Sequence, residues 1–241
     1  MKQRPIQHLV DALGDLGADI SYVENEGFPP LKIVGKKLEK SLVKIPANIS
    51  SQFISSLMLI GSKLENGLEI HLEGKITSRP YLEMTLRLLR RIGISTNWKD
   101  QIIQISPNIK NDKNSQITKC ITESDWSSAS YFYSLAALGR KSINLKSFRP
   151  HSLQGDSAIK EIYWKFFGVN TISQGSESKI SLMPESSFIF PDQISLDMND
   201  CPDIAQTLCV TATALQIPFE ITGLSTLKVK ETDRLIALKN E

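Results

Sequence analysis

Residues 68–92, LEIHLEGKITSRPYLEMTLRLLRRI, decide the fold of this chain. Leu68, Ile70 and Leu72 alternate with charged or polar residues, which is the pattern of a half-buried strand. Over residues 80–92 the apolar residues recur instead at helical spacing. We expect a helix there with one apolar face, formed by Tyr81, Met84, Leu88 and Leu89. The stretch therefore predicts a strand followed by an amphipathic helix.

This strand and helix lie inside a longer unit. A strand at 42–46 and a helix at 50–62 precede them, and short strands near 95–98 and 102–106 follow, which gives the order β-α-β-α-β-β. The order restarts with elements near 118–122, 127–138, 143–145, 156–167, 169–173 and 179–182. It starts a third time with a strand at 193–197, a helix at 203–215, a strand at 218–222 and a helix from Lys230.

The spacing of these elements is nearly constant. The first helices open near Ser50, Ser127 and Asp203, which are 77 and 76 residues apart. The second helices open near Arg79, Leu153 and Lys230, which are 74 and 77 residues apart. A period of this length indicates repeated α/β units.

The N-terminal residues follow the same pattern. Arg4-Pro5-Ile6 opens an amphipathic helix that ends at Gly17, and Arg79-Pro80-Tyr81 opens the equivalent helix 75 residues later. Proline is favourable in a first turn because its missing N–H has no partner there. The chain thus begins and ends at second helices, so we expect a fragment of a longer repeat protein. A permuted natural domain is the alternative.

Composition excludes several classes of protein. The net charge of +2 argues against a nucleic-acid or anionic membrane partner, and no apolar run approaches the ~18 residues that span a bilayer. The N-terminal residues contain no signal-peptide core. Three cysteines, Cys120, Cys201 and Cys209, form no CxxC pair, and the three histidines share no ligand spacing. We therefore expect reduced thiols, a cytoplasmic protein and no metal site.

Polar residues collect where the helices begin. These groups are Arg4, Ser50–Gln52, Ser78–Tyr81, 125–128, 152–156, 202–203 and 230–234. Any one of them is explained as a helix cap. Together they suggest helix N-termini that face one cleft, and such a cleft binds anions, of which phosphate is the commonest. Arg4 and Lys230 oppose the helix dipole, so they make more sense as ligand contacts than as stabilising residues.

These residues resemble a known family, the 5-enolpyruvylshikimate-3-phosphate synthases or 3-phosphoshikimate 1-carboxyvinyltransferases. The matching stretches run in family order along the whole chain: residues 4–6, 8–13, 50–53 and 78–81, then Asp125, 127–132, 154–156, Asp203 and 230–234. The last run, Lys230-Glu231-Thr232-Asp233-Arg234, is close to diagnostic. The resemblance implies an α/β fold of repeated β-α-β-α-β-β units, with buried parallel helices and sheets outside.

The resemblance also implies a reaction. Phosphoenolpyruvate is protonated at its methylene carbon while the 5-hydroxyl of shikimate 3-phosphate attacks C2; phosphate then leaves, and no metal or organic cofactor is needed. The positions matching shikimate 3-phosphate contacts are Ser50, Ser51, Gln52, Ser78, Tyr81, Asp203 and Lys230. Those matching phosphoenolpyruvate contacts are Arg4, Gln52 and Arg234. Asp203 matches the carboxylate at the attacking hydroxyl, and Glu231 matches a proton-transfer carboxylate. In isolation, Asp203 would be explained as an N-cap and Glu231 as an ion-pair partner.

The resemblance covers about the middle half of the family protein. It implies two partial domains, 1–122 on the shikimate 3-phosphate side and 123–241. Thr226 departs from the family, whose members carry a substrate-contacting asparagine there. The family's Lys-Ser motif, its Gly-Asn-x-Gly-Thr loop and its later arginine and lysine are absent from these residues.

Three interpretations follow. We expect the parent protein to be this carboxyvinyltransferase and the isolated chain to be inactive. The alternatives are a non-catalytic module that binds a phosphate ligand, and an enolpyruvyl transferase with another acceptor. We also expect self-association through core surface that the missing units would cover.

Overall fold

A computed structural model describes residues 2–108, 121–173, 178–230 and 232–241. The chain divides into two compact bodies. The first body contains residues 1–119 with 228–237, and the second contains residues 120–227 with 238–241. Within the described residues, no helix is long and apolar enough to cross a bilayer.

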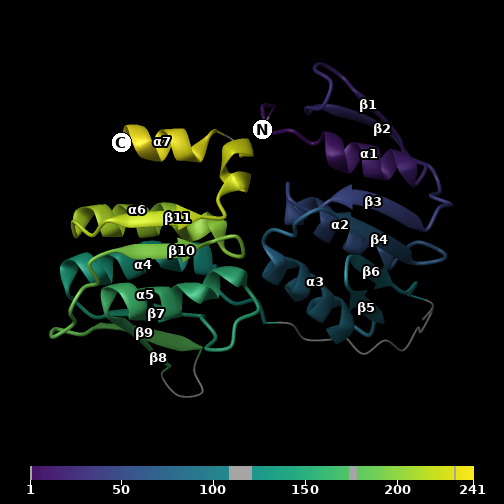
Figure 1. Cartoon of the computed structure of the whole chain (residues 1–241). Helices are drawn as coiled ribbons and strands as arrows, with labels where there is room; N and C mark the ends of the chain where they lie inside the picture. Colours follow the sequence, from purple (N-terminus) through teal and green to yellow (C-terminus); the bar gives the residue numbers. More distant parts are fainter. Residues whose placement is uncertain (1, 109–120, 174–177, 231) are drawn as a thin grey trace. The chain divides into compact units, whose positions relative to one another are not determined.

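Among residues 2–108 the first body contains the helices α1, α2 and α3 and two sheets, and most of α7 (Arg234–Asn240) is grouped with it (Figure 1). Its elements in chain order are α1 (Gln7–Asp15), β1 (Asp19–Tyr22), β2 (Leu31–Val34), β3 (Leu42–Pro46), α2 (Ser51–Gly61), β4 (Leu68–Glu73), α3 (Arg79–Arg91), β5 (Thr96–Lys99) and β6 (Ile102–Ile105). The larger sheet has the order β3-β4-β6-β5, with β3 and β4 parallel and the other pairs antiparallel. β1 and β2 form a separate antiparallel pair.

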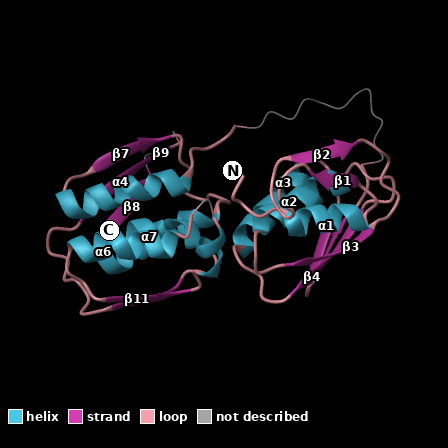
Figure 2. Cartoon of the chain, turned by 90° about the horizontal axis from the view of Figure 1, so that it is seen from above, coloured by secondary structure: helices cyan, strands magenta, loops and turns pink. Residues whose placement is uncertain are grey.

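The core of the first body lies between the larger sheet and the helices. β4 buries Leu68, Ile70 and Leu72, as its alternation predicts. The face of α3 was predicted less well, because the buried residues are Leu82, Thr85, Leu86 and Leu89. Leu88, which the prediction placed on this face, is 42% exposed. α1 contacts β3, α2 contacts β4 and α3 contacts β5, so the three helices cover one face of the larger sheet (Figure 2).

The second body repeats this order. Its elements, together with the C-terminal elements, are α4 (Trp126–Gly139), β7 (Ile143–Lys146), η1 (Gly155–Ala158), α5 (Ile159–Phe167), β8 (Val169–Ser173), β9 (Lys179–Pro184), β10 (Ile194–Asp197), η2 (Pro202–Ile204), α6 (Ala205–Ala214), β11 (Phe219–Thr222), η3 (Ser225–Val229) and α7 (Arg234–Asn240). The sheet β7-β9-β8 is antiparallel and matches β4-β6-β5. The parallel pair β10–β11 matches β3–β4.

In the second body the helices lie between the two sheets. α4 contacts all three strands of β7-β9-β8, while α6 contacts β11 on the other side. Hydroxyl groups join α4 to α6: Ser130 Oγ lies 2.8 Å from Thr207 Oγ1, and Thr211 Oγ1 donates to Ser134 Oγ at 2.8 Å. Both pairs advance one turn in the same direction, so the two buried helices are parallel.

One backbone hydrogen bond recurs in all three repeats, and its acceptor lies one residue later in the second repeat than in the other two. Ala47 N donates to Glu73 O at 2.8 Å, Ser124 N to Ser147 O at 2.7 Å, and Met198 N to Thr222 O at 3.0 Å. The residue that follows the second strand then has a positive φ in each repeat, at Gly74, Ser147 and Gly223. The repeat deduced from element spacing is therefore present in the backbone geometry.

Two details differ from the sequence-based expectation. The last helix begins at Arg234 rather than at Lys230, because Asp233 accepts hydrogen bonds from the N–H groups of Leu235 and Ile236 and so caps it. The pair β1–β2 was not predicted. The strand predicted near 118–122 lies mostly outside the described residues.

Candidate functional site

The N-terminal ends of α2 and α3 lie side by side in the first body. Thr77, just before α3, donates from its N–H to Ala47 O at 3.1 Å and from its hydroxyl to the same oxygen at 3.3 Å. Ala47 lies four residues before α2 begins. The structure therefore brings the Ser50–Gln52 group close to the Ser78–Tyr81 group within one body.

Ser78 has an unusual backbone. It precedes α3 with φ 51° and ψ 40°, in the left-handed region that side-chain-bearing residues avoid at a cost of about 1–2 kcal/mol. The residue is 9% exposed, and its side chain makes no capping hydrogen bond to the helix. Backbone strain of this kind persists where surrounding contacts impose it, and it concentrates at functional sites.

The first turn of α2 presents three of the predicted contacts. Ser50 is the residue before the helix, in an extended conformation and without a side-chain cap. Ser51 is buried and Gln52 is exposed. The Gln52 side-chain oxygen accepts a hydrogen bond of 2.5 Å from Arg4 Nη2. Two residues 48 positions apart, both predicted to contact phosphoenolpyruvate, thus touch directly.

Helix polarity gives this end of the first body a positive character. The first turns of α1, α2 and α3 contain no acidic residue. Arg79, beside Ser78, lies 4.1 Å from the centre of the Trp98 ring and donates to Glu83 at 3.0 Å. Unpaired N–H groups at helix N-termini attract anions when no carboxylate of the protein occupies them.

The predicted residues of the C-terminal run are described in part. Lys230 is half-buried between η3 and α7, and Arg234 is the first residue of α7. Both are grouped with the first body. Glu231, the predicted proton-transfer carboxylate, lies outside the described residues.

In the second body Asp203 occupies the turn η2, which leads into α6, and it is half-buried. The neighbouring helix α4 is capped by Asp125, which accepts from the N–H groups of Ser127 and Ser128 at 3.1 Å each. Partial burial raises the pKa of the Asp125 carboxyl, but the hydrogen bonds from Ser128 and Ser127 outweigh it, so the net pKa is lowered. Asp125 thus has the cap role that a single polar residue at a helix start indicates.

Residues 154–156 of the loop 152–156 matched the family without an assigned role, and the structure supplies one. The Gln154 amide accepts from Trp126 N and donates to Ser124 O, both at 2.9 Å. Asp156 is completely buried and accepts a short hydrogen bond from the Ser127 hydroxyl. The loop therefore fastens the first turn of α4, a contact that spacing along the chain does not reveal.

Thr226 is the residue for which the resemblance implies an asparagine. The residue is 6% exposed, and its hydroxyl has no hydrogen-bond partner within the described ranges. Leu227 beside it is fully buried. The side chain therefore points into the protein rather than toward solvent.

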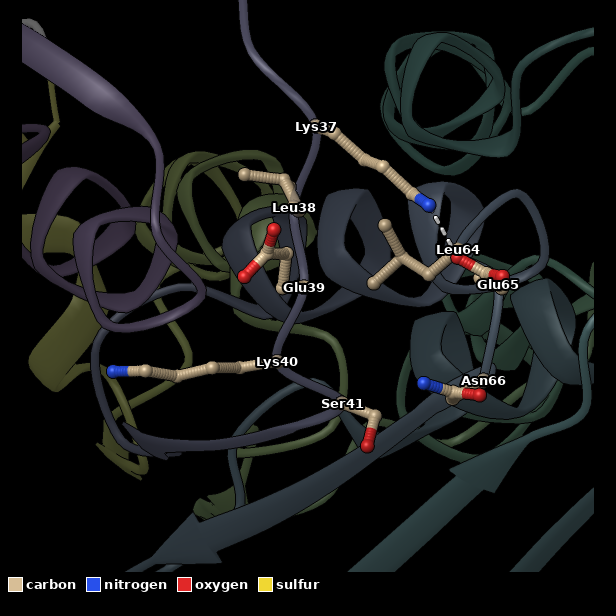
Figure 3. A pocket seen from close by; sticks show the side chains of 8 residues that line it. All are labelled: Lys37, Leu38, Glu39, Lys40, Ser41, Leu64, Glu65 and Asn66. Carbon is tan, nitrogen blue, oxygen red and sulfur yellow. Dashed lines mark ion pairs between the residues drawn. The ribbon is translucent and has the colours of Figure 1, made fainter.

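A surface hollow of about 290 Å³ lies elsewhere in the first body (Figure 3). Its walls are residues 37–41 and 64–66, and an ion pair of 2.5 Å joins Lys37 to Glu65 across it. Both side chains are largely exposed, so the pair is well screened by water. None of the predicted site residues lines this hollow.

No cluster of three or more potential metal ligands occurs among the residues that the structure describes. Cys201 and Cys209 are buried, unpaired thiols. Burial, with smaller contributions from Asp156, Asp200 and Asp197, raises the pKa of Cys201 to about 12. This thiol therefore remains protonated at neutral pH and is a poor nucleophile.

Comparison with known proteins gives one consistent result. The family model described as EPSP synthase (3-phosphoshikimate 1-carboxyvinyltransferase) matches residues 1–241. A 3-phosphoshikimate 1-carboxyvinyltransferase of Bacteroides fragilis is 46% identical over 246 residues, covering 100% of this chain and 57% of the relative. One of Haemophilus influenzae is 37% identical over 244 residues, covering 100% of this chain and 54% of the relative. The chain thus spans about half the length of the curated relatives it matches.

Two solved structures share the fold. EPSP synthase from Acinetobacter baumannii superposes with a TM-score of 0.59 at 21% identity, over 99% of this chain and 53% of that one. The enolpyruvyl transferase NikO from Streptomyces tendae superposes with a TM-score of 0.61 at 10% identity, over 90% of this chain and 51% of that one. At these identities the likeness establishes the α/β fold of repeated units.

Proposed function

Because the chain belongs to the EPSP synthase (3-phosphoshikimate 1-carboxyvinyltransferase) family, we propose that it forms part of an enzyme that transfers the enolpyruvyl group of phosphoenolpyruvate to the 5-hydroxyl of shikimate 3-phosphate. Phosphate is the second product. The observation that supports the proposal most strongly is local to the first body, where Arg4 and Gln52 touch beside three helix N-termini that lack acidic residues.

The proposed roles follow the chemistry of each side chain. Ser50, Ser51, Gln52, Ser78, Tyr81, Asp203 and Lys230 bind shikimate 3-phosphate, and Arg4, Gln52 and Arg234 bind phosphoenolpyruvate. The planar guanidinium suits a bidentate contact to phosphate or carboxylate. Asp203 accepts or orients the proton of the attacking hydroxyl, and Glu231 transfers a proton at the methylene carbon. The reaction needs no cofactor, and we place it in the cytoplasm because Cys201 and Cys209 are free thiols.

Thr226 has no such role in this proposal. Its hydroxyl is enclosed within the protein, so it does not replace the family's asparagine as a substrate contact. The division of the family protein into substrate-binding halves at residues 122 and 123 remains a prediction.

Calorimetry tests the proposal on this chain. Shikimate 3-phosphate is titrated into the wild type, Ser78→Ala and a control, Arg87→Ala, which changes an exposed arginine of the same helix α3. We expect the wild type and the control to bind shikimate 3-phosphate with similar affinity. The affinity of Ser78→Ala should be at least tenfold lower. Equal affinity in all three proteins would refute the assignment of Ser78.

Turnover separates the enzyme from a binding module. The chain covers 54–57% of its curated relatives, so we expect no phosphate release from it alone. A parent protein that adds the remaining family segments should release phosphate from phosphoenolpyruvate only when shikimate 3-phosphate is present. Tight binding without turnover in that longer protein would favour the module, and turnover with a different alcohol would favour another acceptor.

We further propose that the isolated chain associates with a second copy through α4. This helix buries Trp126, Ala129 and Tyr133 on one side, yet Tyr131 is 66% and Leu135 59% exposed on the other. A helix that is apolar on all sides normally has neighbours all round. Sedimentation should therefore show a dimer that Leu135→Lys converts to a monomer; a wild-type monomer would contradict this.

A further inference from the structure

The three N-terminal helix ends of the second body meet at one place. α4 contacts both η1, which leads into α5, and η2, which leads into α6. Each of these ends has backbone N–H groups without partners inside the helix, so partial positive charge accumulates where they meet. If this meeting point is shielded from water, a negatively charged group is needed to stabilise the helix ends.

The side chain of Asp156 lies at this meeting point. It belongs to η1, and its Oδ2 accepts a hydrogen bond from the hydroxyl of Ser127 in the first turn of α4. The third end is near as well, because α4 contacts both η1 and η2, and the charge of Asp156 is one of the smaller causes that raise the pKa of Cys201, the residue immediately before η2. Asp156 has no exposed surface, so its carboxylate is shielded from bulk solvent.

The first body has the matching pair of ends without such a carboxylate. In the repeat α2 corresponds to α4 and α3 to α5; the first turns of α2 and α3 contain no acidic residue, whereas the second body has Asp125 before α4 and Asp156 in η1. Corresponding helix ends therefore carry acidic side chains in the second body and none in the first.

We propose that the carboxylate of Asp156 is a built-in anion that occupies, in the second body, the place that the first body offers to a phosphate group. It joins the first turn of α4 to η1 and excludes a phosphate group from the position between them. Asp156 is thus a positioning residue and not a catalytic one. Because of its charge, we expect phosphate to bind in the first body and not beside Asp156. The inference rests on the proposed function only in taking phosphate as the ligand of the first body.

Anion rescue tests this proposal. Asp156→Ala removes the carboxylate and leaves room for a small anion, while Asp156→Asn keeps the shape and removes the charge. Asp192→Ala is the control, because Asp192 is exposed and lies in the same body. The midpoint of thermal unfolding is measured for each protein in sodium formate, sodium phosphate and sodium chloride at equal ionic strength.

We expect both Asp156 variants to unfold at lower temperature than the wild type. Formate at about ten times its dissociation constant would raise the folded-to-unfolded ratio of Asp156→Ala about elevenfold. For a chain of this size that is a rise of about 3–6 °C over chloride. Asp192→Ala and the wild type should show no such formate-specific rise. If Asp156→Ala does not fold in chloride, recovery of folded protein on dilution into formate is the expected result.

Two outcomes would overturn the proposal. One is an Asp156→Asn variant that is as stable as the wild type, because the negative charge of Asp156 would then make no contribution to stability. The other is an Asp156→Ala variant that responds alike to formate, phosphate and chloride. Titration of shikimate 3-phosphate into the wild type and Asp156→Asn separates the role of Asp156 from the proposed function. Failure of the wild type to bind it would remove the proposed function and leave the anion rescue standing.

Discussion

The left-handed backbone of Ser78 allows two contributions of this residue to be separated: the ligand contact of its hydroxyl group and the strain of its backbone. Ser78→Ala removes the hydroxyl and keeps the strain, whereas Ser78→Gly removes both. A residue with a side chain loses about 1–2 kcal/mol in this region of φ and ψ, and glycine does not. Glycine also makes the unfolded chain more flexible, which reduces the gain in folding stability by about 0.4–1 kcal/mol. Ser78→Gly should therefore be about 0–1.5 kcal/mol more stable than Ser78→Ala.

Binding should respond differently from stability. A hydrogen bond from the hydroxyl to a phosphate oxygen is of the charged kind, which contributes about 1.5–3 kcal/mol. Both variants lack it, so both should bind shikimate 3-phosphate roughly 10- to 150-fold more weakly than the wild type. The unfolding temperature should differ between the two variants: that of Ser78→Gly should be higher than that of Ser78→Ala by up to about 6 °C.

Calorimetry and thermal unfolding of the two variants test this reasoning. If Ser78→Ala binds as the wild type does, the hydroxyl makes no ligand contact. If Ser78→Gly unfolds at a lower temperature than Ser78→Ala, the backbone of residue 78 is not strained. Ser95→Ala is a suitable control, since Ser95 is exposed and lies between α3 and β5.

Three further predictions concern other contacts. Thr226→Val, which removes a buried hydroxyl without a partner in the described residues, should stabilise the chain by about 1 kcal/mol in urea unfolding, and a loss of stability would show that the hydroxyl is satisfied. In a double-mutant cycle Arg4→Ala and Gln52→Ala should be coupled by about 0.5–1.5 kcal/mol, whereas Arg87→Ala and Gln52→Ala should be additive. Asp125→Ala should cost about 0.5–2 kcal/mol at pH 7 through loss of the α4 cap. Because the folded-state pKa of Asp125 is lowered, its contribution is present above the unfolded value near 3.9 and is lost as the pH falls through the folded pKa. The stability difference between wild type and variant should therefore shrink below about pH 4; a constant difference would contradict this.

The sequence predicted the repeat because its signals are local. Alternation in β4 and apolar spacing in α2 each depend on neighbours within a few residues, and the bounds agree with the structure to within about two residues. The start of α7 was misplaced because the run 228–234 contains several possible caps, and only the hydrogen bonds of Asp233 identify the one that is used. The buried face of α3 was displaced because the helix is rich in leucine, so more than one face fits the spacing.

The site was predictable only where the chain matches a family motif. Nothing in the spacing of Arg4 and Gln52 indicates that they touch, and nothing around Asp156 marks it as fully buried. Its partner Ser127 is 29 residues away, and the burial arises from the packing of α4 against η1. Charge at the start of a helix is ambiguous from sequence, because an exposed cap such as Asp125 and a buried carboxylate such as Asp156 have the same local signature.

The two bodies therefore solve one electrostatic problem in opposite ways. Converging helix ends are stabilised by negative charge, whether it comes from the protein or from a ligand. In the second body Asp156 provides this charge where α4 meets η1. In the first body the first turns lack acidic residues, and Arg4 adds positive charge beside them, whereas Arg79 is paired with Glu83. The position of Arg4 opposes the helix dipole and favours a bound oxyanion, so a ligand contact explains this arginine better than a structural role does.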